Sequence, residues 1–317
     1  MMNKIAVFIR RKISLTPTII TLELESSDGQ PLPAYEAGAH IDIELPGGYT
    51  RQYSLCGTPQ QADIYRVGIL LDPQSRGGSI SAHALIEGQT LNISPPKNLF
   101  PLANGKHSIL FAGGIGITPI LSMAYTLAKQ SSSFEMHYCT RSRDQTAFID
   151  ELCSSQFDEQ VHMHFDDECP LSAALVLANP QPDTYLYACG PTGFIKHITE
   201  TAESLGWAKD NIRFELFSAP EAVGIQECGS FEIELSGSGQ VITVAPDQTA
   251  AQAMIDAGIN VPVSCEQGIC GTCLMQVLDG TPDHRDFFLS DDEHAANNQF
   301  TPCCSRSHSA RLVVDFT

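Results

Sequence analysis

The sequence predicts a multi-domain protein with a small antiparallel β-barrel, an α/β domain built on a parallel sheet and a cysteine-rich C-terminal domain. Short strand-like runs punctuated by Gly and Pro fill residues 1–103, and strands alternate with helices from His107 onward. Five of the eleven cysteines fall between positions 265 and 304. A chain of 317 residues accommodates three small domains, which we expect at 1–103, 104–225 and 226–317.

Hydrophobic periodicity places the individual elements. In the first domain it predicts strands at 5–9, 18–25, 40–45, 52–55, 65–71 and 90–94. In the second domain it predicts strands at 108–112, 134–139 and 185–188, with helices after residue 118 and at 194–205. Residues 218–229 lack any period and predict a linker. In the third domain we expect strands at 231–235, 241–244 and 311–316, and a helix at 249–257.

The charge balance excludes some partners. The formal net charge of -19 repels phosphate backbones and anionic lipid, so we expect no nucleic-acid binding and no membrane docking. No run reaches the roughly 18 apolar residues that a membrane span needs. The apolar run 5–9 is short for a secretory signal, and basic residues follow it instead of preceding it. We therefore expect a cytoplasmic protein.

The cysteine pattern indicates a metal centre. Six cysteines are scattered singly through the first 228 residues, which is not the even spacing of a secreted disulfide scaffold. Cys265, Cys270 and Cys273 have the plant-type spacing of a [2Fe–2S] cluster, and Gly268 and Gly271 give their loop backbone freedom. Structural zinc is the alternative, but zinc sites favour a second short-spaced pair. The fourth ligand is Cys303 or Cys304. Only one of these adjacent residues can bind the cluster, because successive strand residues point to opposite faces.

Two turns between a strand and a helix are suited to a nucleotide. Residues 113–119 read Gly-Gly-Ile-Gly-Ile-Thr-Pro, and we expect Thr118 as the helix N-cap and Pro119 as its first residue. Helix N–H groups in such a turn suit a pyrophosphate, although the run is not the G-x-G-x-x-G fingerprint. Residues 189–192, Cys-Gly-Pro-Thr, form the second turn, which we expect at the same end of the sheet.

Two motifs in the barrel suggest a flavin-like ligand. Residues 51–55 read Arg-Gln-Tyr-Ser-Leu, and residues 76–79 read Arg-Gly-Gly-Ser before a helix. The second motif is suited to a terminal phosphate, and Tyr53 and Ser54 are suited to the face and the edge of a flat ring. Taken alone, a strand arginine and a turn arginine are usually solvated surface residues, and the motifs by themselves favour that interpretation.

The combination of motifs in this order resembles the phthalate dioxygenase reductase family over nearly the whole chain. The segment from Asp283 to Arg306 is most similar to vanillate O-demethylase reductases, and carnitine monooxygenase reductases are similar too. The resemblance implies an FMN-binding barrel, an NAD-binding domain and a β-grasp, plant-type ferredoxin domain. It implies electron transfer from NADH through FMN and a [2Fe–2S] cluster to a Rieske non-haem iron oxygenase.

The family also implies roles for individual residues. FMN would contact Arg51, Tyr53, Ser54, Arg76, Gly77, Gly78 and Ser79. The nucleotide would lie against Gly113, Gly114, Gly116, Thr118, Cys189, Gly190 and Pro191, with Cys189 near the nicotinamide and Phe217 by the flavin. The family pattern makes Cys303 the fourth cluster ligand. We expect no acid–base catalyst, because a flavin only has to take a hydride and release electrons singly.

One segment conflicts with the simple nucleotide rule. Thr140, Arg141, Ser142 and Arg143 follow the strand at 134–139, where an acidic residue usually binds the ribose of NADH and an arginine suits NADPH. The choice of NADH, like that of FMN over FAD, follows the family.

The same motifs allow other functions, and two further features lie outside them. A reductase for a separate ferredoxin or cytochrome uses the same residues, whereas a non-catalytic iron–sulfur carrier needs neither nucleotide turn. His162 and His164 are two apart on a strand and could face a metal, but nothing in the sequence supplies the remaining ligands. The acidic run at 290–293 is either a solvated face or a docking site for a basic patch on the oxygenase.

Overall fold

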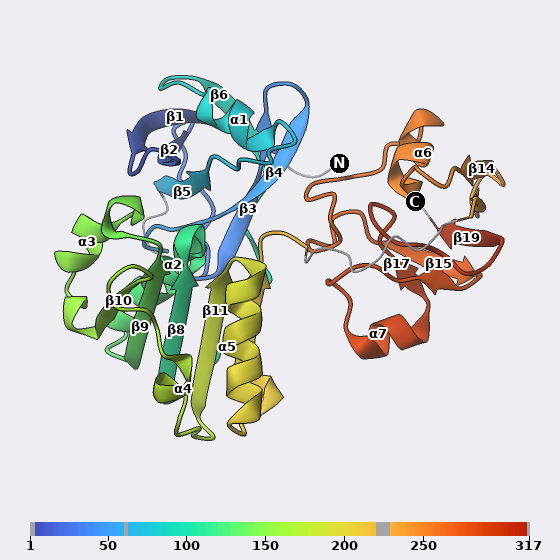
Figure 1. The fold of residues 1–317 in the computed structure, drawn as a ribbon. Coiled ribbons are helices and arrows are strands. Elements are labelled where there is room, and N and C mark those ends of the chain that lie inside the picture. Colours follow the sequence, from blue (N-terminus) through green and yellow to red (C-terminus); the bar gives the residue numbers. More distant parts are fainter. Residues whose placement is uncertain (1–3, 60–62, 220–228, 316–317) are drawn as a thin grey trace. The chain divides into compact units, whose positions relative to one another are not determined.

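A computed structural model describes residues 4–59, 63–219 and 229–315, and it divides into two compact units, Met1–Phe217 and Ser218–Thr317. The first unit contains the barrel and the parallel sheet, and the second contains the cysteine loop (Figure 1). Most of the predicted linker falls at 220–228, which lies outside the described residues, as does residue 316 of the last predicted strand.

The barrel is an antiparallel sheet that is nearly closed. Its strands are β1 (Ile5–Ser14), β2 (Ile19–Ser26), β3 (Ala39–Leu45), β4 (Tyr49–Ser54), β5 (Ile64–Leu70), β6 (Thr90–Ile93) and β7 (Lys97–Asn98). Six of them follow the order β4-β3-β6-β1-β2-β5, and β7 pairs with β3. A bridge between Leu55 and Val67 joins the two ends. The helix α1 (Gly78–His83) follows β5, and alternate apolar residues such as Ile41 and Ile43 fill the interior. Every strand predicted in 1–103 is present.

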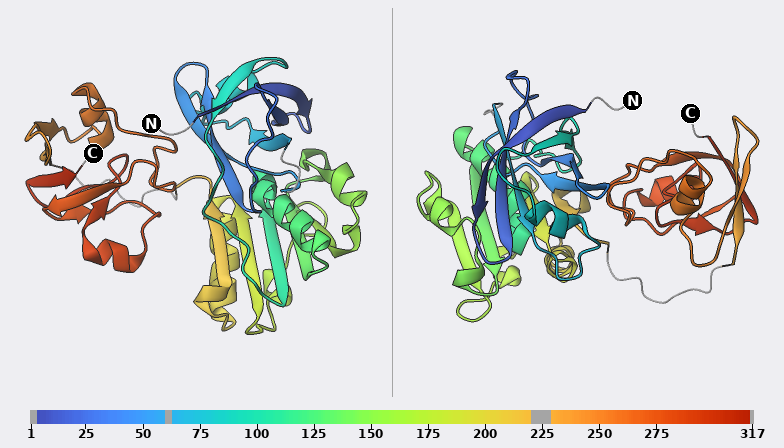
Figure 2. Two further views of the ribbon diagram at one scale, coloured as in Figure 1. Left: turned by 180° about the vertical axis from the view of Figure 1, so that it is seen from behind. Right: turned by 90° about the horizontal axis from the view of Figure 1, so that it is seen from above.

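The second part of this unit is a five-stranded parallel sheet in the order β10-β9-β8-β11-β12. The strands are β8 (His107–Gly113), β9 (Ser133–Thr140), β10 (Val161–Phe165), β11 (Thr184–Gly190) and β12 (Ile212–Leu216). The α-helices are α2 (Ile117–Lys129), α3 (Ile149–Cys153), α4 (Ala173–Val176) and α5 (Thr192–Ser204). The 3₁₀ turns are η1 (Gly114–Gly116), η2 (Arg143–Gln145), η3 (Asp158–Gln160) and η4 (Lys209–Asn211). Helix α5 covers the sheet face seen in Figure 1, and α2 covers the face seen from behind in Figure 2.

The predicted start of α2 is wrong. The helix begins at Ile117 with Gly116 as its N-cap, because η1 continues directly into it. Thr118 and Pro119 therefore lie inside the first turn. The Thr118 side chain is buried, and its hydroxyl donates a hydrogen bond to the carbonyl of Ile115 instead of capping the helix.

The barrel and the parallel sheet share one core. Ile19 and Cys56 of the barrel pack in the same buried cluster as Leu110, Ile120 and other residues of β8 and α2. Across this contact, a Cβ placed on Gly68 of β5 would lie 2.7 Å from the Thr118 methyl group. The glycine lets the barrel approach the nucleotide turn closely.

The second unit has a five-stranded sheet in the order β14-β13-β19-β15-β17. The strands of this sheet are β13 (Phe231–Leu235), β14 (Val241–Val244), β15 (Met275–Asp279), β17 (Gln299–Phe300) and β19 (Arg311–Asp315). The strands β16 (Pro282–Asp283) and β18 (Arg306–Ser307) form a separate two-stranded sheet. The helix α6 (Ala250–Asp256) packs on this sheet, and the Thr249 hydroxyl caps it by accepting from the Gln252 N–H. The helix α7 (Asp291–Ala296) begins with a capping box, which is formed by Ser290 and Glu293.

None of the helices in the described ranges is long and apolar enough to cross a membrane.

Candidate functional site

The two predicted nucleotide turns meet at one end of the parallel sheet. Strands β8 and β11 are neighbours, and their register pairs Ala112 with Cys189. A Cβ on Gly116 would lie 2.2 Å from the Cys189 carbonyl oxygen, so only glycine permits this backbone contact. Gly114, in the same turn, has the positive φ of 53° that favours glycine. The expectation that both turns lie at one edge is confirmed.

Cys189 is fully buried at the end of β11. Burial raises the pKa of its thiol well above the ordinary value, so the side chain stays neutral. Its paired residue on the neighbouring strand β12 is Glu215. A neutral thiol suits the neighbourhood of a nicotinamide better than a thiolate does.

The two barrel motifs also come together. A Cβ on Gly78, at the start of α1, would lie 2.7 Å from Nε of Arg51, so the guanidinium of β4 rests against the predicted phosphate turn. Gly77 precedes the helix with a φ of 99°, and its missing Cβ leaves room for the Tyr49 ring. The backbone N–H groups of this turn and Arg51 form a cradle that fits a phosphate.

The edge of the predicted flavin site contains a residue that sequence reasoning missed. Ser54 is buried at the end of β4 and hydrogen-bonds Glu215 of β12. Burial raises the pKa of Glu215 to about 8, and among the described residues its Oε2 atom has no hydrogen-bond partner. Burial also raises the pKa of the adjacent Tyr53 to about 12. Phe217 is 38% exposed, which leaves its ring accessible to an aromatic cofactor.

The turn after β9 differs from the simple expectation. Arg143 stacks over the Phe165 ring, with Cζ 5.0 Å from the ring centre, while the Ser142 hydroxyl donates to Asp144. An acidic residue therefore does lie in this turn, two residues beyond Ser142. It lies further from the strand end than the rule places the ribose-binding acid.

The cysteine loop brings four thiols together. Hydrogen bonds with Cys270 and Cys303 lower the pKa of the Cys265 thiol, and a hydrogen bond with Cys303 lowers the pKa of the Cys273 thiol. The Gln267 N–H donates to the Cys265 sulfur over 3.4 Å. Convergent thiols with N–H donors are the environment that a [2Fe–2S] cluster requires, so the residues present fit this group.

The two adjacent cysteines differ in their contacts. Cys303 interacts with the thiols of Cys265, Cys273 and Cys304, whereas the Cys304 sulfur interacts with Cys303 and also lies 3.3 Å from the Thr301 hydroxyl and 3.8 Å from that of Ser305. The Cys304 sulfur also packs against the cysteine loop, because a Cβ on Gly268 would lie 2.4 Å from it. This arrangement favours Cys303 as the fourth ligand.

A buried carboxylate supports the loop from behind. Asp286 accepts hydrogen bonds from the Leu289 N–H at 2.8 Å and the Ser305 hydroxyl at 3.3 Å, and its backbone lies against Gly268. Gly271 has a φ of 65°, and a side chain there would strike the Phe288 ring. Sequence reasoning did not find these packing partners, because only the fold brings residues 286–289 to the loop.

The 2Fe-2S iron-sulfur cluster binding domain family matches residues 233–308. With the barrel and the parallel nucleotide sheet, this domain defines an iron–sulfur flavoprotein reductase. A vanillate O-demethylase oxidoreductase from Pseudomonas sp. (strain HR199 / DSM 7063) is 52% identical over 302 residues, which are 94% of this chain and 95% of the relative. The chain belongs to the phthalate dioxygenase reductase family.

Two solved structures support this assignment. Phthalate dioxygenase reductase, described as a modular structure for electron transfer from pyridine nucleotides to [2Fe–2S], is 36% identical with a TM-score of 0.78, covering 99% of this chain and 98% of that one. An intact type IV self-sufficient cytochrome P450 monooxygenase is 36% identical with a TM-score of 0.85, covering 98% of this chain and 41% of that one. The protein is an NADH-dependent oxidoreductase that uses FMN and a [2Fe–2S] cluster.

Proposed function

We propose that this reductase supplies electrons from NADH to the Rieske-type terminal oxygenase of a vanillate demethylase-like system in the cytoplasm. The observation that carries the proposal is the 52% identity with a vanillate O-demethylase oxidoreductase across almost the entire length of both chains. The convergence of four thiols in the second unit supports the same assignment, because an oxygenase that takes single electrons needs a one-electron donor.

We propose the following residue roles. Cys265, Cys270, Cys273 and Cys303 hold the cluster. FMN binds Arg51, Tyr53 and Ser54 along β4, and its phosphate binds Arg76, Gly77, Gly78 and Ser79. NADH binds the turns of Gly113, Gly114, Gly116, Thr118, Cys189, Gly190 and Pro191, with Phe217 beside the flavin. These roles divide the chain into an FMN domain at 1–103, an NAD domain at 104–225 and a ferredoxin domain at 226–317.

The division of labour follows from the cofactors. When bound, FMN would supply the conversion of a two-electron hydride transfer into single-electron transfers, and the cluster would supply a one-electron carrier. The chain's own residues bind and orient these groups. Arg51 neutralises the phosphate, the thiol of the buried Cys189 stays uncharged, and the contact between Gly116 and Cys189 fixes the two nucleotide turns relative to each other.

A second candidate acceptor is a cytochrome P450. The reason is that this chain is similar in structure to part of an intact self-sufficient cytochrome P450 monooxygenase, and the matched part makes up 41% of that longer chain. The same cofactors serve either acceptor, and only the surface that meets the partner differs.

Reconstitution distinguishes the two acceptors. The holoprotein is mixed with NADH and either a vanillate O-demethylase oxygenase with vanillate or a purified P450 with its substrate. We expect NADH consumption coupled to vanillate demethylation and at least tenfold slower reduction of the P450. Faster turnover with the P450 would contradict the proposal. The Cys270→Ser variant is the control, because it should keep NADH-driven ferricyanide reduction and lose the coupled reaction.

A further inference from the structure

A group of histidines and a glutamate lies on one face of the parallel sheet, on residues with no proposed role in cofactor binding. Glu135 and His137 are two apart on β9, and His162 and His164 are two apart on β10, so each pair faces the same side of the sheet. The register places His137 beside His162. The expectation that no further ligands lie beside His162 is corrected here, because only strand pairing brings β9 against β10.

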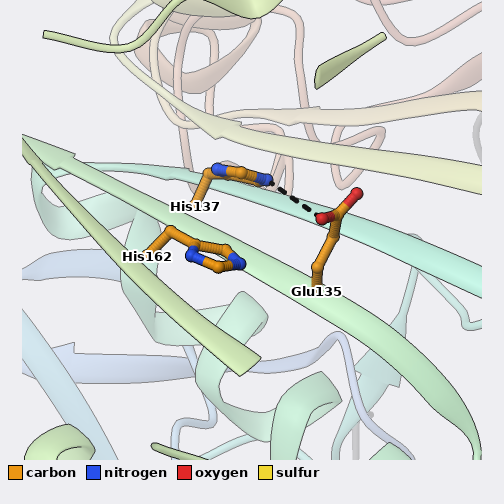
Figure 3. Close-up of side chains that lie close together, drawn as sticks. All are labelled: Glu135, His137 and His162. Carbon is orange, nitrogen blue, oxygen red and sulfur yellow. Dashed lines mark ion pairs between the residues drawn. The ribbon is translucent and has the colours of Figure 1, made fainter. Parts of the chain in front are cut away.

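The donor atoms of three of these side chains converge (Figure 3). A carboxylate oxygen of Glu135 and a ring nitrogen each of His137 and His162 lie within 4.8 Å of one another. A tetrahedral site with Zn–N bonds of about 2.0 Å places its donors roughly 3.3 Å apart. Each distance between two donor atoms must therefore shorten by about 1.5 Å at most for an ion to bind. The exposed His162 and the half-buried Glu135 can turn by this amount, since neither is locked in the core.

His137 provides a second, independent observation. Its ring is only 5% exposed, yet within the described parts of the chain its Nε2 atom has no hydrogen-bond partner. This atom lies 3.7 Å from a Glu135 oxygen, and the His162 ring stacks on the His137 ring with 4.9 Å between ring centres. A buried nitrogen without a hydrogen bond is costly, and a metal ion at this position would satisfy it.

The remaining contacts of His137 resemble those of a metal ligand. Its Nδ1 atom lies 3.0 Å from Nε2 of His164, and Phe111 stacks beneath the ring with 5.2 Å between ring centres. Histidines that bind a metal through one nitrogen usually engage the other in a hydrogen bond, which fixes the ring and its tautomer.

We propose that Glu135, His137 and His162 bind one divalent transition-metal ion of the Zn²⁺ class, with His164 positioning His137. Two imidazoles and one carboxylate suit zinc, whereas Mg²⁺ and Ca²⁺ prefer all-oxygen sites. Three protein ligands leave a fourth position for water or a small anion. Bound metal would join β10, an edge strand of the sheet, to β9.

Zinc titration of the intact holoprotein tests the proposal. The protein, loaded with FMN and its cluster, is titrated with Zn²⁺ against a chelating dye, and the product is measured by zinc X-ray absorption. We expect one zinc per chain with a first shell of nitrogen and oxygen at about 2.0 Å. A sulfur shell at about 2.3 Å would place the zinc on cysteines and overturn the proposal, as would failure to compete with the dye.

Variants locate the ion. His162→Ala and Glu135→Gln change partly exposed side chains and should each weaken zinc binding at least tenfold while leaving the FMN content unchanged. His197→Ala, an exposed histidine of α5, should bind zinc like the wild type. His294→Ala is the sharper control, because His284, Asp286 and His294 form the other group of potential ligands among the described residues. Loss of zinc in His294→Ala with retention in His162→Ala would refute the assignment.

Discussion

Arg66 of β5 and Glu151 of α3 form a bidentate ion pair, with N–O distances of 2.7 and 2.8 Å, that joins the barrel to the parallel sheet. The Arg66 guanidinium also donates to the Cys56 carbonyl and stacks over Phe148. The two side chains are 22% and 28% exposed, so water screens the pair less than a surface ion pair. This pair links the part that holds the flavin to the part that holds the nucleotide.

The first prediction concerns this pair. Glu151→Ala leaves a half-buried guanidinium without its partner, which should cost about 2 kcal/mol and lower the Tm of this unit by roughly 4–8 °C. The matched control is Glu25→Ala, which breaks the more exposed pair with Arg10 and should cost less than about 1 kcal/mol. Thermal unfolding of both variants measures the difference, and equal losses would show that the pair between β5 and α3 has no special role.

The second prediction concerns the contact of the two nucleotide turns. Gly116→Ala puts a methyl group 2.2 Å from the Cys189 carbonyl, so the turns must separate, at a cost of about 1–3 kcal/mol. We expect kcat/KM for NADH with ferricyanide to fall at least tenfold. Gly193→Ala is the matched control, because a Cβ at this position would have no atom within 4 Å and α5 should gain up to about 1 kcal/mol. Wild-type kinetics in Gly116→Ala would contradict the role of the contact.

The third prediction separates the adjacent cysteines. Cys303→Ser should abolish the cluster, because its thiol faces those of Cys265 and Cys273. Cys304→Ser should retain it, since a serine hydroxyl can keep the hydrogen bonds with Thr301 and Ser305. Iron and acid-labile sulfide content, with the visible spectrum, measure the outcome. A cluster that survives Cys303→Ser and disappears in Cys304→Ser would reverse the ligand assignment.

Local patterns predicted the main strands of the barrel, because most of them carry a hydrophobic pattern of their own, but they did not predict β12 at 212–216 or β15 at 275–279. The exact start of α2 was missed because the 3₁₀ turn at 114–116 has no sequence signature distinct from a glycine loop. The capping box of Ser290 and Glu293 did have a signature, the S-x-x-E pattern, but the segment was considered only as a charged surface.

The site was less predictable wherever it depends on strand pairing. Ser54 and Glu215 are far apart in sequence, and only the fold places β12 beside the end of β4. The same holds for Glu135 and His162, whose proximity depends on the register of β9 and β10. Motifs contained within one turn, such as the cysteine loop, were readable because their geometry is local.

The fourth prediction tests the acidic run as a docking site. Glu293 belongs to the capping box, whereas Asp291 and Asp292 are exposed in the first turn of α7. The double variant Asp291→Asn with Asp292→Asn should therefore keep the cap. It should lose the small stabilisation that acidic side chains give to the N-terminal end of the helix dipole, and it should attract a basic partner less strongly. We expect a shallower salt dependence of the electron-transfer rate to the oxygenase. The charge-matched control is Asp166→Asn with Asp167→Asn, two exposed acids of the first unit. An identical salt dependence in both double variants would rule out docking at α7.

The fifth prediction follows from the raised pKa of Glu215. An unfolded glutamate titrates near its ordinary value of 4.5, whereas burial raises the folded pKa to about 8. Between these values the folded state holds a proton that the unfolded state has released, so the free energy of unfolding falls as the pH rises from 4.5 to 8. Glu215→Gln removes this titration. Its Tm relative to the wild type should therefore increase steadily from about pH 5 to about pH 8.

The control for this pH effect is a glutamate whose pKa shifts the other way. The hydrogen bond with Lys4 lowers the pKa of Glu44, so Glu44 titrates below 4.5 and its contribution to stability is lost only in acid. Glu44→Gln should therefore show a constant Tm difference from the wild type between about pH 5 and about pH 8. If Glu215→Gln behaves in the same way, the carboxyl is already ionised in this range, and the proton that we place beside Ser54 is absent.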